Sequence, residues 1–254
     1  MITIKDLSFK YEKSLKNVLN SISFEINPGT VNVLLGLNGC GKTTLIKLLA
    51  GLLDIMEGDI LYDGKSIKEL SIKDRSKTFA YVAQIRSGNE EFLVKDYLAY
   101  GFVNTLKFYE SPKKEQLDEI DVIAKRFNIE HLLDKQLGQL SGGEKQIVTI
   151  ASAIIQNTPI VILDEPTSAL DLKNQNLVLS ILREIAKEGK TIIMSSHNPN
   201  HALFLDGNVL LMNNGQIVKN GIAKDIVNAD ALKEVYGDAI CYSSDLDYKE
   251  ISFK

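Results

Sequence analysis

A glycine-rich stretch that ends in lysine and threonine has the residue types and spacing of a phosphate-binding loop. Its three glycines can adopt backbone conformations closed to other residues, so that successive N–H groups point at one anion. The Lys42 ammonium can reach the outer phosphates of a nucleotide, and the Thr43 hydroxyl can bind Mg²⁺. We therefore predict a nucleotide site formed by Gly36, Leu37, Asn38, Gly39, Cys40, Gly41, Lys42, Thr43 and Thr44.

Two neighbouring acidic residues could supply a metal ligand and a general base. Asp164 and Glu165 directly follow the apolar run Ile160–Leu163. One carboxylate at such a strand end can lie beside Mg²⁺, directly or through water, and the next can orient and polarise an attacking water. Two acids at a strand end are also common in ordinary loops, so the pair alone leaves both interpretations open.

Three further side chains are candidates for contacts with the nucleotide. His197 and Gln84 each follow an apolar run, and ligands collect at the carboxyl ends of strands in parallel sheets. His197 could contact the γ-phosphate and hold water and base in register, Gln84 could reach Mg²⁺ or the water, and Tyr11 could stack on adenine. The alternatives are a surface-loop histidine, a solvated strand end and an aromatic side chain that covers a sheet.

The surrounding apolar patterns predict the elements that must position these residues. Val31–Leu35 predicts a strand before the loop and Leu45–Ala50 a helix after it, as a phosphate-binding loop requires. Similar patterns predict strands at 2–9, 22–26, 58–64, 79–83, 160–163 and 191–194, helices at 170–187 and 232–236, and a hairpin of 209–212 with 216–219.

The segment from residue 87 to 139 has a different character. Apolar residues recur at helical spacing in Val94–Phe102, Pro112–Phe127 and Glu130–Leu133, and Pro112 is suited to a helix start. The sequence Leu140–Glu144 interrupts this pattern, and a further helix is predicted to run to about Gln156. We interpret the segment as a helical insert between two halves of an α/β core.

Composition and charge are those of an ordinary globular protein. The 254 residues include 44% hydrophobic and 24% charged residues, and the net charge of -4 provides no global basic field for nucleic acid. Cys40 and Cys241 have neither metal-ligand spacing nor a disulfide framework. The first residues do not resemble a signal peptide, and no apolar run has the length to span a bilayer. Work at a membrane would therefore need another subunit to supply the membrane part.

Taken together, the motifs resemble those of the ATP-binding subunit of an ABC transporter. The match covers essentially the whole chain, and the Ser-Gly-Gly signature at 141–143 separates it from other P-loop NTPases. The motifs that carry the resemblance, in chain order, are residues 36–44, Gln84, 140–144, 162–166, 168–171 and His197.

The resemblance implies an α/β P-loop NTPase (RecA-like) core with an N-terminal antiparallel β subdomain and an inserted α-helical subdomain near 87–157. It implies ATP and Mg²⁺ as cofactors, with Glu165 orienting the water and His197 supporting the geometry. Two such domains would close head to tail around two ATP molecules. Ser141, Gly142 and Gly143 of one copy would then bind the γ-phosphate held by Lys42 of the other. A plain helix cap, with Ser141 before Glu144, also explains the signature.

Two segments indicate a subfamily of ABC transporters. Val94–Leu98 and Leu232–Gly237 are similar to importers of iron–siderophore, haem or cobalamin, although the Gly-Arg pair usual after the first segment is replaced by Gly101-Phe102-Val103. We therefore expect a peripheral subunit at the cytoplasmic face of the membrane. Its expected partners are transmembrane permease subunits, an extracytoplasmic substrate-binding protein and a second, identical nucleotide-binding domain, with no nucleic acid.

Three other functions remain as alternatives to an importer. They are an exporter ATPase, a soluble ABC protein that acts on DNA or ribosomes, and a non-hydrolysing regulatory partner. Departures from the family pattern are small: Lys145 stands where Arg is common, Ser196 where Thr is frequent, and Asn198 where Asp usually follows the histidine. None removes a catalytic group, so we expect an active ATPase. We also expect alkylation of Cys40 to block nucleotide binding.

Overall fold

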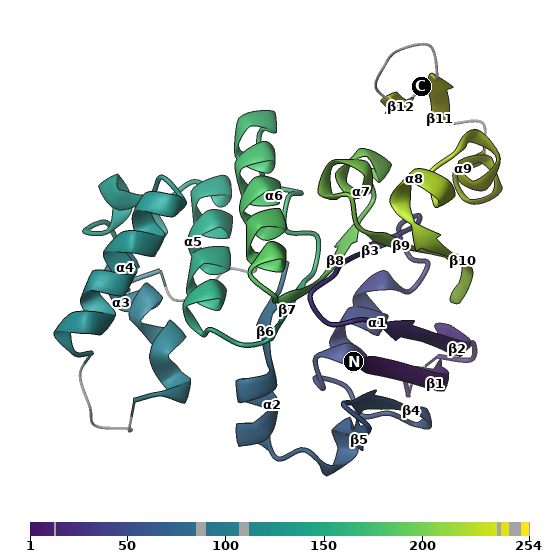
Figure 1. Cartoon of the computed structure of the whole chain (residues 1–254), viewed down its shortest axis with the longest axis horizontal. Helices are drawn as coiled ribbons and strands as arrows, with labels where there is room; N and C mark the ends of the chain where they lie inside the picture. Colours follow the sequence, from purple (N-terminus) through teal and green to yellow (C-terminus); the bar gives the residue numbers. More distant parts are fainter. Residues whose placement is uncertain (13, 85–89, 107–111, 238–239, 244–249, 254) are drawn as a thin grey trace.

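Apolar runs of the chain pair into a central six-stranded sheet with the order β10-β9-β3-β8-β7-β6 (Figure 1). The computed structural model describes residues 1–12, 14–84, 90–106, 112–237, 240–243 and 250–253, with side chains up to residue 237. The central strands are β3 (Val31–Leu35), β6 (Phe79–Val82), β7 (Ile160–Leu163), β8 (Thr191–Ser196), β9 (Asn208–Asn213) and β10 (Gln216–Ile222).

Strand direction in this sheet brings the candidate residues to one edge. Strands β9, β3, β8, β7 and β6 are parallel, and only β10, among the described strands of this sheet, pairs antiparallel through the predicted hairpin with β9. The carboxyl ends of β3, β6, β7 and β8 therefore lie side by side. The residues that directly follow these ends are Gly36, Ala83, Asp164 and His197.

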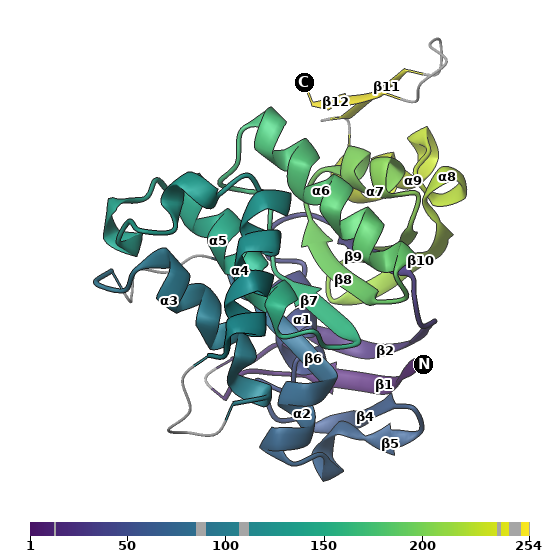
Figure 2. The ribbon, with the colours of Figure 1, turned by 60° about the vertical axis from the view of Figure 1, so that its left-hand side comes forward.

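A second, antiparallel sheet covers one face of the central sheet. Its order is β2-β1-β4-β5, and its strands are β1 (Ile2–Phe9), β2 (Leu19–Ile26), β4 (Glu57–Tyr62) and β5 (Lys65–Ser66). Helix α1 (Lys42–Leu49) packs between the two sheets, because Leu34 and Ile193 of the central strands share a buried cluster with Leu45 of α1 and Ile4 of β1. Figure 2 shows β1, β2 and β4 as a layer of their own. The predicted β subdomain is confirmed.

Helices cover the opposite face. Val33 and Val161, whose side chains alternate with those that face α1, join the cluster of helices α5 (Gly142–Ile155), α6 (Leu172–Lys187) and α7 (Pro199–Leu205). Beyond them lie α3 (Val94–Ala99) and α4 (Lys114–Arg126), which form the predicted helical part (Figure 1). Residues 87–89, where this part was predicted to begin, lie outside the described residues.

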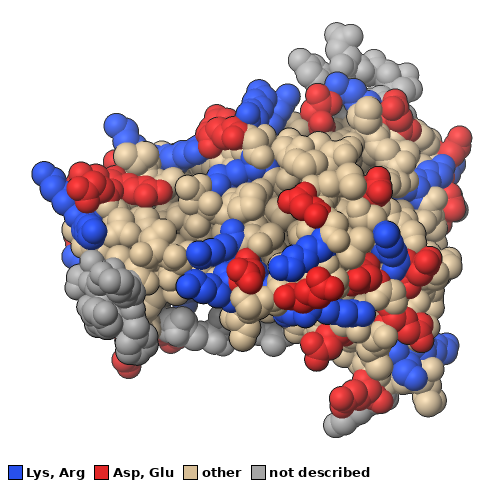
Figure 3. Space-filling view, turned by 60° about the horizontal axis from the view of Figure 1, so that its bottom comes forward, with Lys and Arg blue, Asp and Glu red and all other residues tan. Residues whose placement is uncertain are grey.

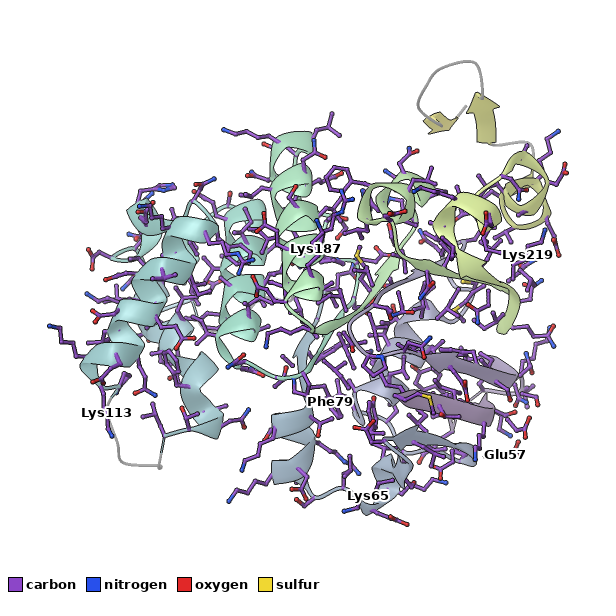
Figure 4. All side chains as sticks on the ribbon, in the orientation of Figure 1. Glu57, Lys65, Phe79, Lys113, Lys187 and Lys219 are labelled. Atoms are coloured by element: carbon purple, nitrogen blue, oxygen red, sulfur yellow. The ribbon has the colours of Figure 1, made fainter. Side chains whose placement is uncertain are left out.

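Several predicted boundaries need correction. Helix α4 begins at Lys114, with Lys113 rather than Pro112 at its start (Figure 4). The predicted helix 94–102 divides into α3 and a 3-10 helix, Tyr100–Asn104, and the segments Glu130–Leu132 and Leu137–Gln139 are also 3-10. Helix α6 begins two residues later than predicted, because the Asp171 side chain caps it by accepting from Asn174 N–H.

Other elements were not predicted. Helix α2 (Ile72–Thr78) buries no residue, so it shows no apolar periodicity; it leads into β6 at Phe79 (Figure 4). Helices α7 and α8 (Ala223–Ile226) are short, α9 (Ala229–Tyr236) starts before the predicted 232–236, and a hairpin of β11 (Ile240–Ser243) and β12 (Glu250–Phe253) follows. Among the described residues, no helix combines the length and the apolar character that crossing a membrane requires.

Candidate active site

The loop after β3 has the backbone that phosphate binding requires. Gly36, Gly39 and Gly41 have φ angles of 156°, 80° and 110°, which side chains rarely tolerate. A Cβ at Gly36 would lie 2.5 Å from the Met212 carbonyl oxygen, and one at Gly41 would lie 2.8 Å from Leu19 Cδ2. Gly41 is also the N-cap of α1, so the first N–H groups of this helix point out of the loop. The loop therefore offers an anion site at a helix N-terminus.

Lys42 is held at the mouth of this loop. Its side chain is 5% exposed, and Nζ donates hydrogen bonds to the carbonyl oxygens of Gly36 at 2.9 Å and Leu37 at 3.1 Å. The same Nζ lies 3.9 Å from Glu165 Oε1. The ammonium thus lies between the phosphate loop and the predicted general base, where it can neutralise charge on a terminal phosphate.

A buried carboxylate lies beside the Thr43 hydroxyl. Thr43 Oγ1 donates to Asp164 Oδ1 at 3.2 Å, and Ser195 Oγ donates to the same oxygen at 2.7 Å. Within the described chain, no basic side chain is within ion-pair distance of Asp164, although a buried carboxylate is costly without a cation. A hydroxyl and a carboxylate in contact are the oxygen ligands that Mg²⁺ prefers, so the residues present fit this metal.

Glu165 adopts an unusual conformation that directs it into the site. Its φ is 46°, in the left-handed region that is uncommon outside glycine, and such strain persists where the surroundings fix it. Ser195 Oγ accepts from the Glu165 N–H at 2.9 Å, and Ser168 binds the Glu165 carbonyl oxygen through both its N–H and its hydroxyl. His197 Nδ1 lies 4.0 Å from Glu165 Oε2, with the imidazole about half exposed. The histidine can therefore steady the carboxylate, and its contact with the γ-phosphate stays a prediction.

One cavity of about 450 Å³ joins the phosphate loop to Glu165, whereas Asp164 and His197 are not among its lining residues. Gln84, exposed two residues beyond the end of β6, also lines this cavity, and its contact with Mg²⁺ or the attacking water stays a prediction. The lining residues are Val18, Asn38, Gly39, Gly41, Lys42, Thr43, Thr44, Gln84 and Glu165.

Tyr11 fits both of its interpretations. Its ring packs edge-on against Phe9 at 5.0 Å, which covers the end of β1, and its hydroxyl lies 3.2 Å from Thr44 Oγ1. The ring is 41% exposed. The side chain is thus tied to the phosphate loop and keeps an open aromatic face, so adenine stacking stays a prediction.

Ser141, Gly142 and Gly143 lie apart from this cavity. Ser141 caps α5 in a capping box, donating its N–H and hydroxyl to Glu144 Oε2 at 2.8 and 2.7 Å and accepting from Glu144 N–H at 3.3 Å. These bonds lower the pKa of Glu144. A Cβ at Gly142 would meet nothing within 4 Å, so nothing in the described chain requires glycine there. The helix-cap interpretation is confirmed, and the contact of Ser141–Gly143 with the nucleotide of another copy stays a prediction.

Comparisons with known proteins identify the family of this chain. The family model for ABC transporters matches residues 19–168. The chain belongs to the ABC transporter family. An uncharacterised ABC transporter ATP-binding protein of Haemophilus influenzae is 37% identical over 93% of this chain and 89% of its own length. A candidate iron chelatin transport ATP-binding protein of Helicobacter pylori is 33% identical over 97% of this chain and 98% of its own.

A solved structure of an ABC transporter also resembles this chain. An inward-facing conformation of a candidate metal-chelate type ABC transporter covers 100% of this chain and 96% of its own, with 27% identity and a TM-score of 0.83. This chain is therefore an ATP-binding, ATP-hydrolysing ABC subunit. A cassette of Clostridium perfringens that is 32% identical, with a TM-score of 0.76, is described as part of an ABC transporter complex.

One prediction for this ABC subunit needs correction. Cys40 is 7% exposed, and its thiol lies beneath the loop, because a Cβ at Gly36 would be 2.7 Å from Cys40 Sγ. Burial raises the pKa of the thiol, while the nearby Lys42 opposes this. The Cys40 N–H donates to the Leu37 carbonyl oxygen at 3.3 Å, within the loop itself. The expected attack of an alkylating reagent on the folded loop therefore meets a buried thiol.

Three residues of the site were not identified from the sequence. Ser195 binds both acids, His201 is buried beside the turn that carries His197, and the Tyr236 hydroxyl lies 3.5 Å from the His197 carbonyl oxygen. Burial raises the pKa of Tyr236. The sequence could have indicated Tyr236, because this residue belongs to the importer-like segment 232–237. It could also have indicated Ser195, because this polar residue follows an apolar run near the end of a strand.

Proposed function

We propose that this subunit uses ATP hydrolysis to energise the import of a metal chelate: an iron chelate, haem, cobalamin or a related complex. Three observations support this proposal: the candidate iron chelatin transport relative, which matches nearly full length, the metal-chelate type structure at TM-score 0.83, and the importer-like segments Val94–Leu98 and Leu232–Gly237. Both segments contribute to the core, through Val94 and Leu98 in one and Tyr236 in the other.

The observation that carries the mechanism is the convergence of Lys42, Glu165 and His197. Glu165 polarises a water for in-line attack on the γ-phosphate, and His197, 4.0 Å away, keeps its carboxylate in place. Lys42 and the N-terminal end of α1 offset the charge that develops on the transferred group. Mg²⁺, held by Thr43 and Asp164, would further neutralise the phosphates. Gln84 lies on the wall of the same cavity, from which it would contact Mg²⁺ or the attacking water.

A second copy of the chain would complete the site. The signature Ser141–Gly143 is exposed or half-buried on its own chain, at a helix N-terminus suited to an anion. We propose that the identical cassette presents it to the γ-phosphate held by Lys42, closing a homodimer around two ATP molecules. Hydrolysis and product release then reopen the dimer.

The transmembrane partner would dock on the helical part of the subunit. A groove of about 910 Å³ lies between α3 and α4, and Tyr100, Val103 and Leu117 on its wall are each more than half exposed. Exposed apolar side chains around a groove suit an apolar helix of a permease. We propose that the subunit acts at the cytoplasmic face of the membrane, and that an extracytoplasmic binding protein delivers the chelate.

A nucleic-acid partner is not favoured. On the face drawn in Figure 3, Lys and Arg side chains alternate with Asp and Glu, so this face has no single-signed basic stripe. This face therefore gives no support to the alternative of a soluble ABC protein that acts on DNA or ribosomes.

Affinity capture of the tagged subunit from detergent-solubilised membranes tests the proposal. A many-helix permease together with a binding protein that takes up ferric chelate, haem or cobalamin would support it. A permease without a binding protein would favour export, and recovery with ribosomes or DNA would overturn transport. Val103→Asp should abolish permease capture while ATP hydrolysis by the subunit persists. Val122→Asp, an equally exposed valine of α4 outside the groove, is the matched control.

A further inference from the structure

A second histidine is buried next to the turn that carries His197. His201 lies in the first turn of α7 and is 6% exposed. Its Nδ1 lies 2.9 Å from Ser196 Oγ, and its Nε2 lies 3.4 Å from Gln175 Oε1 of helix α6. The ring therefore bridges two segments: the turn after β8 and the first turn of α6.

The hydrogen-bond network assigns the proton on this ring. Gln175 Nε2 donates to the carbonyl oxygens of Leu170 at 3.0 Å and Thr167 at 3.3 Å, which leaves Gln175 Oε1 as an acceptor towards His201. With the proton on Nε2, His201 donates to Gln175 Oε1 and its Nδ1 accepts from Ser196 Oγ, with Thr167 Oγ1 at 3.5 Å from the same nitrogen. In this tautomer Asn198 Nδ2, also 3.4 Å from Nε2, makes no hydrogen bond to the ring. Ser196 Oγ in turn accepts from the Asn198 N–H at 3.0 Å. A neutral ring uses both nitrogens, and burial, followed by the nearby charge of His197, lowers the pKa of His201 to about 4.

One end of this network lies next to His197, and the other end lies in the loop of Glu165. Ser196 is the residue directly before His197, and Asn198 is the residue directly after it. Thr167 and Leu170 lie in the loop that begins with Glu165. Glu165 and His197 are 4.0 Å apart. A chain of hydrogen bonds also connects their two loops through buried side chains, running from Ser196 through His201 and Gln175 to Thr167.

We propose that His201 and Gln175 are positioning residues that hold the His197 turn against the Glu165 loop. Neither residue is among those that line the phosphate-loop cavity; they fix the spacing at which His197 supports Glu165. This inference rests on the proposed roles of Glu165 and His197 in hydrolysis. An apolar side chain of similar size would fill the space as well as an imidazole, but it would leave Ser196 and Gln175 without their partner and free the turn to move.

The test uses the purified full chain with Mg-ATP, and it separates hydrolysis from binding. His201→Leu should lower kcat by about tenfold or more while the ATP dissociation constant changes less than about twofold. His201→Gln, which offers an acceptor and a donor, should recover most of kcat. Thr158→Val is the control: it removes a buried hydroxyl at the opposite end of β7, where Thr158 bonds only to the Ile160 carbonyl oxygen through its side chain.

A double mutant decides between positioning and a general loss of stability. In a His197→Ala background, adding His201→Leu should lower kcat by less than about twofold further, because the residue that it positions is gone. An equal drop in both backgrounds, or an unchanged kcat in His201→Leu, would overturn the proposal.

A second variant covers the case in which His201→Leu does not fold. Gln175 is only partly buried, so Gln175→Glu should fold, yet it replaces the amide that donates to Leu170 and Thr167. The same loss of kcat at unchanged ATP affinity is expected, and an unchanged kcat would contradict the inference. If the wild-type chain itself bound ATP without hydrolysing it, the proposed function would fail instead, so the two failures are distinguishable.

Discussion

The hydroxyl of Thr43 donates a 3.2 Å hydrogen bond to the carboxylate of Asp164, although 121 positions separate the two residues. The contact joins the first turn of α1 to the carboxyl end of β7, and the Ser195 hydroxyl binds the same carboxylate oxygen from β8. Three elements therefore converge on one buried negative charge beside the phosphate loop. A cation would stabilise such a charge, so we expect Mg²⁺ binding to depend on this contact rather than on either residue alone.

Asp164→Asn should separate metal dependence from nucleotide binding. The amide keeps a hydrogen-bonding group near Thr43 and Ser195 but removes the charge, so the Mg²⁺ concentration that half-activates hydrolysis should rise by about tenfold or more. ATP binding measured in EDTA should stay the same. The measurement is ATP turnover against free Mg²⁺, with the exposed Asp63→Asn as control. An unchanged Mg²⁺ requirement would show that Asp164 does not help to hold the metal.

Glu165→Gln should bind ATP and lose turnover. Loss of a general base typically lowers the rate by about 10²-fold to 10⁴-fold, while the contacts of Lys42 and the loop with the phosphates remain. The variant should therefore accumulate as an ATP-bound dimer, visible by size-exclusion chromatography in Mg-ATP. Phosphate release at the wild-type rate would rule out Glu165 as the base.

The sequence was most informative where side-chain chemistry and apolar runs coincide. Strand β3 matches its predicted bounds, because the run Val31–Leu35 is buried on both faces and leads into glycines whose conformation no other residue can adopt. The order of the strands, and with it the contact of Thr43 with Asp164, was not predicted, since no local pattern encodes which distant strands pair.

Other features depended on packing that a sequence pattern does not reveal. His201 lies in a helix that starts at Pro199, where the residues Asn198-Pro199-Asn200 read as a turn. Helix α2 has no buried face, so it has no periodicity to detect. The direction of the Cys40 thiol, under the loop rather than towards the phosphates, depends on the backbone angles of the neighbouring glycines.

Gly142→Ala should impair dimer closure without harming the fold. A methyl group there meets open space in the described chain, and alanine is favoured over glycine in a helix by about 1 kcal/mol. The midpoint of thermal unfolding should therefore stay the same or rise slightly. In a Glu165→Gln background, the ATP-bound dimer should form less readily, because the methyl group obstructs the approach of a partner's nucleotide. A stable fold with undiminished dimer formation would exclude the signature from the interface.

The buried imidazole of His201 predicts a pH dependence of stability with a definite sign. Burial, and then the charge of His197, lowers its pKa in the fold to about 4, below its ordinary value of 6.5. As the pH falls, the unfolded chain therefore takes up the proton first. The stability that the neutral ring contributes is complete above about pH 6.5 and is lost as the pH falls towards about 4, by at most about 3 kcal/mol.

The measurement compares wild type with His201→Gln in urea unfolding followed by circular dichroism from pH 7 to pH 4. Carboxylates titrate in both proteins and cancel in the difference. The free energy of unfolding of the wild type, minus that of the variant, should therefore decrease steadily below pH 6.5. A difference that stays constant over this range would mean that His201 keeps its ordinary pKa in the fold, and that the tight, neutral bridge between Ser196 and Gln175 does not form.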